Sequence, residues 1–165
     1  MANEAVATAF VGIGSNLDGP ERRVRLALDA LDGLPRTRVV RHSRLYRTAP
    51  WGRSEQPDFV NAVAEVSTAL APRALLDALL ALELAQGRLR DGTRWGPRTL
   101  DLDLVAYDAV RLVEPGLTVP HPRIAERAFV LLPLAEIAPD FDIPGVGRVR
   151  DLAAAVGEQG CRALD

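Results

Sequence analysis

Alternating extended and helical patterns restrict the possible folds of this chain more than any other feature of its sequence. Apolar, β-branched runs predict strands at 5–13, 37–47, 59–67 and 99–107. Apolar residues at helical spacing predict two helices between these strands, the first opened by Pro20 and the second by Pro72. The order strand, helix, strand, strand, helix, strand predicts an α+β domain with a ferredoxin-like βαββαβ core, whose helices cover one face of an antiparallel sheet.

The last third of the sequence predicts C-terminal additions to this core. Residues 110–112 are expected to pair back on the strand at 99–107. Residues 124–137 are expected to be helical with an interruption at Pro133, and a final helix is predicted near 150–156. The sequence contains no internal repeat and no linker-like tract, so we expect residues 1–165 to form a single domain.

The charged residues argue against several classes of function. With 20 basic and 22 acidic residues among 165, the formal net charge is −2, which disfavours capture of nucleic acid or an anionic membrane by a broad basic surface. All the basic residues are arginines, whereas phosphate-loop NTPases, protein kinases and Schiff-base enzymes need a lysine. The single cysteine, Cys161, permits no internal disulfide. Because the sequence shows no signal-peptide or membrane-span pattern, we expect a cytoplasmic protein.

A pair of aspartates on the predicted strand at 99–107 carries the strongest chemical signal. If 100–105 is extended, Asp101 and Asp103 point to the same face, about 6.6 Å apart along the backbone, while the alternating leucines face the core. Neighbouring carboxylates repel each other, so such a pair suggests a divalent cation, and oxygen ligands suggest Mg²⁺. Taken alone, the pair is also compatible with a solvated polar strand face.

Four arginines precede the aspartate pair, interspersed with glycines: Arg88, Arg90, Arg94 and Arg98. Guanidinium groups keep their charge and bind phosphate oxygens in bidentate fashion. Beside two carboxylates, they suggest a polyphosphate site in which Mg²⁺ lies between the aspartates and the phosphates. The competing interpretation is a loop that only balances its own charges.

With these residues the chain resembles the 6-hydroxymethyl-7,8-dihydropterin pyrophosphokinase family. The family signature Gly-Pro-Arg-x-x-Asp-Leu-Asp stands at 96–103, and matching segments occur in order at 12–17, 46–50, 56–61, Glu83, 88–90 and 119–121. The resemblance covers essentially the whole chain. It implies an enzyme that moves the β,γ-diphosphate of ATP onto the hydroxymethyl group of the pterin and releases AMP, in folate biosynthesis.

The resemblance also implies roles for individual residues. Asp101 and Asp103 would ligate two Mg²⁺ ions that bridge the ATP phosphates, and Arg88 and Arg98 would be the catalytic arginines nearest the transferred group. ATP would also be bound by Glu83, Arg90, Arg94, Leu104, Leu117, Thr118, His121 and Arg127. The pterin would be bound by Thr48, Ala49, Pro50, Trp51, Phe59, Asn61, Trp95 and Phe129, with its ring between the two phenylalanines.

The implied partners are the two small-molecule substrates, with no nucleic acid, membrane or obligate protein partner. Two alternatives remain open from the residues. An ordinary γ-phosphoryl kinase on the same fold would need the same Mg²⁺ and arginines, and its product would be ADP rather than AMP. A non-enzymatic ferredoxin-like binding module is the other; an RNA-binding sheet would display stacking aromatics on a basic surface, whereas aromatic residues make up only 5% of this slightly acidic chain.

Overall fold

The computed structural model describes residues 5–16, 19–48, 58–86 and 100–164. Over these residues the chain forms, in order, β1 (Ala7–Ser15), α1 (Pro20–Asp32), β2 (Thr37–His42), β3 (Tyr46–Thr48), β4 (Phe59–Thr68), α2 (Pro72–Gln86), β5 (Asp101–Tyr107), β6 (Leu112–Glu114), β7 (Leu117–Val119), the 3₁₀ helix η1 (Ile124–Glu126), α3 (Ala128–Ile137), β8 (Asp142–Ile143), β9 (Gly147–Arg148), α4 (Val149–Val156) and β10 (Cys161–Ala163). No helix within these ranges is both long and apolar enough to cross a membrane.

The main sheet is antiparallel, and β1 lies inside it between β4 and β5. Its strand order is β10–β3–β4–β1–β5, and β2 also pairs with β4. Because α1 connects β1 to β2 and α2 connects β4 to β5, the part β2–β4–β1–β5 has the predicted ferredoxin-like order. The α+β prediction is therefore confirmed.

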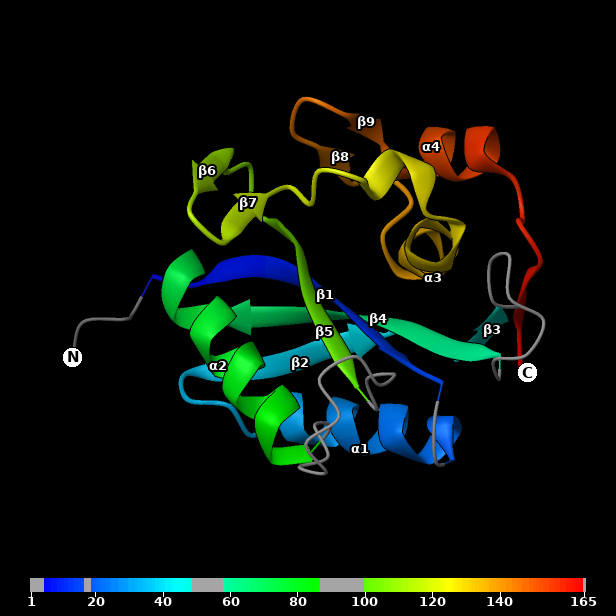
Figure 1. Ribbon diagram of the computed structural model, residues 1–165. Coiled ribbons are helices and arrows are strands. Elements are labelled where there is room, and N and C mark those ends of the chain that lie inside the picture. Colours follow the sequence, from blue (N-terminus) through cyan, green and yellow to red (C-terminus); the bar gives the residue numbers. More distant parts are fainter. Residues whose placement is uncertain (1–4, 17–18, 49–57, 87–99, 165) are drawn as a thin grey trace.

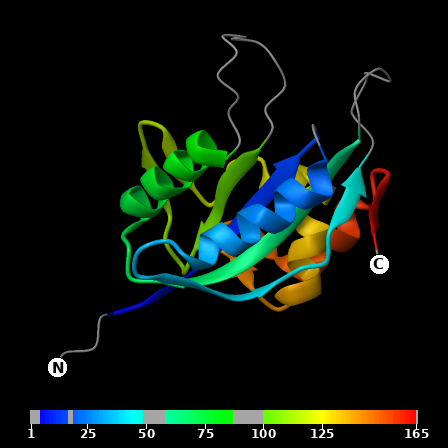
Figure 2. The ribbon, with the colours of Figure 1, turned by 90° about the horizontal axis from the view of Figure 1, so that it is seen from below.

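Helices cover both faces of the sheet (Figure 1). The core helices α1 and α2 lie on one face of the sheet and share one hydrophobic cluster with it. Figure 2 views the molecule with these two helices in front of the sheet. The later helices α3 and α4 lie on the opposite face and form a second cluster around Phe10, Val105, Leu131 and Leu134. The core helices thus share one face as predicted, and the C-terminal additions cover the other.

The boundaries of α1 follow from its sequence. Pro20 occupies the first turn, where its missing N–H has no helical partner to lose, and Gly33 follows the last residue. The buried side chains recur at i, i+3, i+4 and i+7: Val24, Ala27, Leu28 and Leu31. In α2 the buried positions are Leu75, Leu79 and Glu83, and Leu80 is 41% exposed. Leu80 therefore lies off the buried row, which begins at Leu75 and continues in steps of four residues.

The predicted strand at 37–47 is divided into β2 and β3. Ser43 lies at the break, where its N–H donates to Val63 O at 2.9 Å and its Oγ accepts from Val63 N at 3.0 Å. A side-chain oxygen thus takes the place of a backbone acceptor in the ladder, which ends β2 and redirects the chain into β3.

Two predictions for the C-terminal part are wrong. Residues 112–114 form β6, which pairs with β7 instead of β5, because a two-residue turn at Pro115 and Gly116, with Gly116 at a φ of 75°, joins β6 directly to β7. Pro133 lies inside α3 without interrupting it, since the missing N–H removes only one helical bond. The interruption falls instead at Arg127, which is extended between η1 and α3. The final helix is confirmed as α4, whereas β10 is an unpredicted strand.

Candidate active site

A cavity of about 830 Å³ lies on the sheet face that α3 covers. Its walls come from strands β1, β4 and β5, the end of β3, the η1–α3 junction, and the end of α4 with the segment that follows it. The lining residues are Gly12, Ile13, Gly14, Thr48, Phe59, Asn61, Ala62, Asp101, Asp103, Arg123, Glu126, Arg127, Phe129, Val130, Val156 and Gln159. This cavity brings the predicted aspartate pair together with four of the predicted pterin residues.

Two glycines of β1 form the floor of the cavity. Gly12 lies opposite Asp103 in β5, and Gly14 lies opposite both Asp101 in β5 and Asn61 in β4. A Cβ at Gly14 would come within 2.6 Å of Asn61 Nδ2, and one at Gly12 would contact Val105 and Asp103. The space between the aspartates and Asn61 therefore exists because the central strand has no side chains there.

The alternation predicted for β5 is confirmed. Leu100, Leu102 and Leu104 are buried in the cluster with α1 and α2, and Asp101 and Asp103 are half-buried on the other face, where they line the cavity. Oδ2 of Asp103 lies 3.9 Å from Nη1 of Arg127. The carboxylate pair thus faces a guanidinium across the cavity.

Arg127 and Phe129 enter the cavity from the η1–α3 junction. The Arg127 guanidinium carbon lies 5.5 Å from the centre of the Phe129 ring, within the range of a cation–π contact. Nearby, the backbone N–H of His121 donates to Val105 O at 2.9 Å, which ties this residue to β5. Burial and the nearby Arg127 lower the pKa of His121, and its Nδ1 accepts from Arg123 N, so the imidazole is neutral with its proton on Nε2 at neutral pH.

The opposite end of the cavity has an aromatic and amide lining. Phe59 is half-buried, and Thr48 and Asn61 are only 4% and 8% exposed. Among the described residues, Thr48 Oγ1 and Asn61 Oδ1 are buried without a hydrogen-bond partner, although Asn61 Nδ2 donates to Ile13 O at 3.5 Å. Buried polar atoms nearly always have partners, so Asn61 Oδ1 is available to accept a hydrogen bond in the cavity, whereas the Thr48 side chain lies beside the Cys161 thiol.

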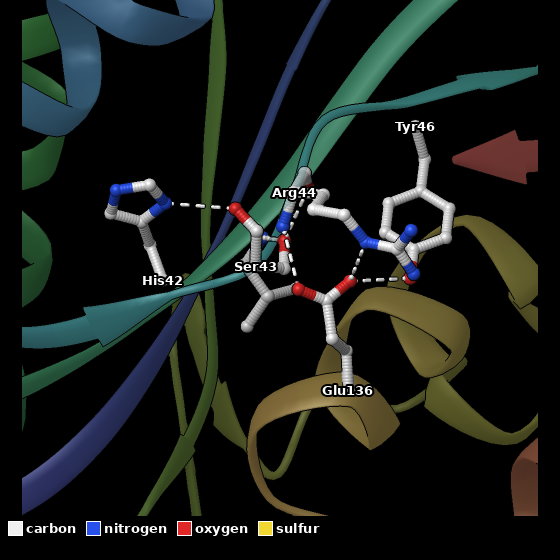
Figure 3. Close-up of polar contacts among 6 residues, drawn as sticks. His42, Ser43, Arg44, Tyr46 and Glu136 are labelled. Carbon is white, nitrogen blue, oxygen red and sulfur yellow. Dashed lines mark hydrogen bonds and ion pairs between the residues drawn. The ribbon is translucent and has the colours of Figure 1, made fainter. Parts of the chain in front are cut away.

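Outside the cavity lining, Glu136 near the end of α3 connects this helix to the segment between β2 and β3 (Figure 3). Its carboxylate accepts from Arg44 N at 2.9 Å, from Arg44 Nε at 3.1 Å and from Tyr46 Oη at 2.7 Å. Burial alone would raise the pKa of Glu136, but the hydrogen bonds from Tyr46 and Arg44 outweigh it and hold that pKa below its usual range. Burial, together with the bond to Glu136, raises the pKa of Tyr46 to about 12.

Several residues predicted to bind ATP do not line this cavity. Glu83 is 3% exposed, on the opposite face of the sheet, and its Oε2 accepts from Leu102 N at 2.7 Å. Leu104 and Leu117 are 5% and 4% exposed and belong to the cluster with α1 and α2. Thr118 is half-buried in β7. Glu83 thus supports the strand that carries the aspartates, and the predicted contacts of these four residues with the nucleotide stay predictions.

Eight predicted site residues lie outside the described ranges, so their roles also stay predictions: Ala49, Pro50, Trp51, Arg88, Arg90, Arg94, Trp95 and Arg98. The sequence interpretation assigned no site role to Gly12, Gly14, Arg123 or Gln159, all of which line the cavity. Glycines two apart in a predicted strand could have indicated the floor, since i and i+2 share a face. Nothing in the local sequence could have indicated Gln159.

The carboxylate pair suits a cation that is bound together with a phosphate ligand. Within the described ranges no group of three or more His, Cys, Asp or Glu side chains could hold a metal by itself. Mg²⁺ characteristically takes one or two protein carboxylates and completes its octahedron with water and substrate phosphates. Asp101 and Asp103 therefore fit Mg²⁺ that arrives with a nucleotide.

Comparisons with known proteins agree with this geometry. A family model described as 7,8-dihydro-6-hydroxymethylpterin-pyrophosphokinase matches residues 10–139. The 2-amino-4-hydroxy-6-hydroxymethyldihydropteridine pyrophosphokinase of Pseudomonas aeruginosa is 48% identical over 159 residues, covering 96% of this chain and 98% of its own. The enzyme of the same name from Methylorubrum extorquens is 41% identical over 157 residues, covering 95% and 98%.

Solved structures show the same fold at much lower identity. The Plasmodium falciparum HPPK-DHPS crystal structure with pteroate has a TM-score of 0.71 and 13% identity, covering 94% of this chain and 43% of that longer chain. This chain thus corresponds to less than half of the solved protein. Given the family model and the curated relatives, the chain belongs to the 7,8-dihydro-6-hydroxymethylpterin-pyrophosphokinase family.

Proposed function

We propose that this protein transfers the β,γ-diphosphate of ATP to the hydroxymethyl group of 6-hydroxymethyl-7,8-dihydropterin and releases AMP, a step in folate biosynthesis. Its family and its named relatives support the reaction. The observation that carries the assignment to this site is a cavity whose lining combines a carboxylate pair on β5 and a guanidinium with an amide and aromatic side chains across β1. Such a cavity suits a polyphosphate next to a flat heterocycle.

The pterin belongs at the end formed by Phe59, Asn61, Thr48 and Phe129. A flat heteroaromatic ring with donors and acceptors along one edge needs ring faces to stack on and an amide to pair with. Asn61 Oδ1 is a buried oxygen that can accept hydrogen bonds from the ring's N–H groups. The family resemblance adds the backbone at 48–51 and Trp95 to this pocket.

The phosphates of ATP belong at the other end. Asp101 and Asp103 would hold two Mg²⁺ ions, which when bound would neutralise phosphate charge and make the phosphorus more electrophilic. Arg127 lies within reach of the same carboxylates and offers a bidentate contact to a phosphate oxygen pair. The family resemblance places Arg88 and Arg98 nearest the transferred group and Arg90, Arg94 and His121 on the nucleotide.

The chemistry asked of these residues is mainly positioning. The pterin hydroxyl oxygen attacks the β-phosphorus in line with the α,β-bridging oxygen; the bond from the β-phosphorus to that oxygen breaks and AMP departs as the new P–O bond forms, and the hydroxyl proton is released to solvent. Phe59, Asn61 and Phe129 orient the acceptor, and the arginines stabilise charge as it moves onto the phosphate oxygens. A cavity walled on one side by α3 also limits the access of water, which would otherwise compete for the diphosphate.

The deciding experiment is product analysis with ATP, Mg²⁺ and the reduced pterin alcohol. AMP and a diphosphorylated pterin are expected in equal amounts, with no AMP when the pterin is omitted. ADP with a monophosphorylated pterin would instead identify a γ-phosphoryl kinase. If the pterin binds but ATP is not consumed, the protein is a binding module and the proposal is wrong.

A further inference from the structure

The backbone at the η1–α3 junction lacks a side-chain cap of its own. Arg127 is the extended residue there, with φ −113° and ψ 94°, and its side chain does not cap α3. Glu126 is the last residue of η1, and its C=O lies on one side of Arg127. Ala128 is the first residue of α3, and its N–H lies on the other side. Groups in these positions have no helical partner and need one from elsewhere.

Gln159 supplies both partners from a segment 31 residues further along the chain. Its Oε1 accepts from Ala128 N at 3.3 Å, and its Nε2 donates to Glu126 O at 3.2 Å. The two bonds lie on opposite sides of Arg127 and hold both of its peptide groups. Only an amide side chain offers a donor and an acceptor at this spacing without charge.

The chain after α4 is shaped to present this side chain. Gly157 and Gly160 have a φ of 74°, and Gln159 itself has a φ of 49°, in the left-handed region that costs a non-glycine residue energy. Directly afterwards β10 pairs with β3, and Cys161 lies opposite Thr48. Gln159 is therefore held between α4 and a strand of the main sheet, and it lines the cavity at the η1–α3 junction.

We propose that Gln159 is a positioning residue that holds Arg127, and with it Phe129, in the direction needed for ATP and pterin binding. The inference deepens the proposed function, because it rests on Arg127 contacting the ATP phosphates. An arginine side chain is long and flexible, so the direction of its Cα–Cβ bond decides where the guanidinium can reach. Fixing both flanking peptides keeps that group beside Asp103 and over the Phe129 ring.

The test compares binding in two backgrounds by calorimetry, with Mg²⁺ and α,β-methylene ATP as the probe, because this analogue lacks the bond that the reaction breaks. Gln159→Ala should weaken binding of the probe by about three- to tenfold in the wild-type background. In an Arg127→Ala background the same substitution should have no further effect, because Gln159 acts through Arg127. Gln159→Glu keeps the acceptor but sets a carboxylate oxygen against Glu126 O, so it should weaken binding at least as strongly as Gln159→Ala. Glu158→Ala, at the exposed neighbouring position, serves as the matched control and should bind like wild type.

The outcomes distinguish a Gln159 that positions Arg127 from a Gln159 that only stabilises the fold. Equal weakening by Gln159→Ala in both backgrounds, accompanied by a fall in melting temperature, would mean that Gln159 only stabilises the fold, and it would overturn the inference. No weakening in the wild-type background would overturn it as well. If Arg127→Ala alone leaves binding unchanged, the assignment of Arg127 to ATP fails, and the inference fails with it. In steady-state kinetics, Gln159→Ala should raise the KM for ATP by more than it lowers kcat.

Discussion

At Gly14 the absence of a side chain is itself a requirement of the site. Any Cβ there would come 2.6 Å from Asn61 Nδ2, so the amide must move out of its place at the cavity. We expect Gly14→Ala to raise the KM for the pterin alcohol by about tenfold or more, equivalent to about 1.4 kcal/mol of binding free energy. The KM for ATP should change far less, because the added methyl group faces Asn61.

Steady-state kinetics with each substrate varied in turn will measure this difference. Gly33→Ala is the matched control, since it makes the same chemical change after α1, where a Cβ would meet only Ala30 O at 3.5 Å. Equal pterin KM values for the two variants would contradict the role given to Gly14.

Asp101 and Asp103 carry charge without contributing to the hydrophobic core. Because both are half-buried and line the cavity, Asp101→Asn and Asp103→Asn should each fold normally. Each should lower kcat by about a hundredfold or more, or about 2.7 kcal/mol of barrier, since the amide removes an anionic ligand from Mg²⁺. Single-turnover kinetics beside a melting curve checks this expectation. A variant that keeps its rate within about tenfold of wild type would show that the metal lies elsewhere.

At the scale of the elements, the Glu136 link between α3 and the β2–β3 region should make stability depend on pH. The pKa of Glu136 is lowered in the fold, so its contribution is present above the ordinary glutamate pKa and is lost as pH falls through the folded value. The pKa of Tyr46 is raised to about 12, so its contribution is present below pH 10 and is lost as pH rises towards 12.

Glu136→Gln should lower the free energy of unfolding by about 1–2 kcal/mol at pH 7, because charge-assisted hydrogen bonds become neutral ones. The difference from wild type should shrink as the pH falls below the ordinary glutamate pKa, because the carboxylate of the unfolded chain then takes up a proton, and it should disappear once the pH is below the lowered pKa of the folded state. Urea denaturation at a series of pH values measures both effects, with Glu158→Gln as an exposed control. A difference that stays constant down to pH 3 would show that the carboxylate charge does not stabilise this link.

The hydrogen bond from Leu102 N to Glu83 Oε2 connects β5 to α2. It allows a test of whether Glu83 stabilises the fold or contacts the nucleotide. Glu83→Leu leaves the N–H of Leu102 without this acceptor, so the free energy of unfolding should fall by about 1–3 kcal/mol. Glu83→Gln keeps an acceptor and should be milder. Thermal melts beside the KM for ATP will distinguish the two roles. A raised KM with an unchanged melting temperature would favour the nucleotide contact that the family resemblance implies.

The elements that could be predicted are those whose pattern is local. The period of apolar residues changes clearly between β1 and α1, and the alternation of Asp and Leu in β5 fixes which face carries the carboxylates. The three residues of β10, like the three of β6, are too few to show a period, and β6 pairs with β7 across the turn at Pro115 and Gly116.

The same limit applies to the site. Asp101 and Asp103 are recognisable from their spacing together with the arginines that precede them, and Asn61 and Phe129 from the family resemblance. Gly14 acquires its role only through the register that places it between Asn61 and Asp101. Gln159 acquires its role through a contact across 31 residues. Neither relation is encoded in neighbouring residues.

At the scale of the whole molecule, the cavity lies between the ferredoxin-like core and the C-terminal additions. A ligand held there contacts β1, β4 and β5 on one side and the η1–α3 junction on the other. Binding should therefore stabilise both parts together. At one hundred times its dissociation constant, α,β-methylene ATP with Mg²⁺ should add about 2.7 kcal/mol, or roughly 5 to 10 °C in melting temperature.

Differential scanning calorimetry measures this shift, with Asp103→Asn as the comparison. The variant should show little stabilisation at the same ligand concentration, and so should wild type when Mg²⁺ is replaced by EDTA. Equal stabilisation with and without Mg²⁺ would contradict a metal-dependent nucleotide site.

The glycine floor of β1 also has a consequence for inhibitors. A compound that rests on Gly12 and Gly14 contacts main-chain atoms rather than side chains. A mutation changes the side chain of a residue but not its main-chain atoms. A substitution at Gly14 would displace Asn61, and one at Gly12 would place a methyl group beside Asp103 and Val105. Either change would reduce the space that the substrates themselves need. Resistance to such a compound would therefore have to arise at the walls of the cavity, while the floor stays a fixed target.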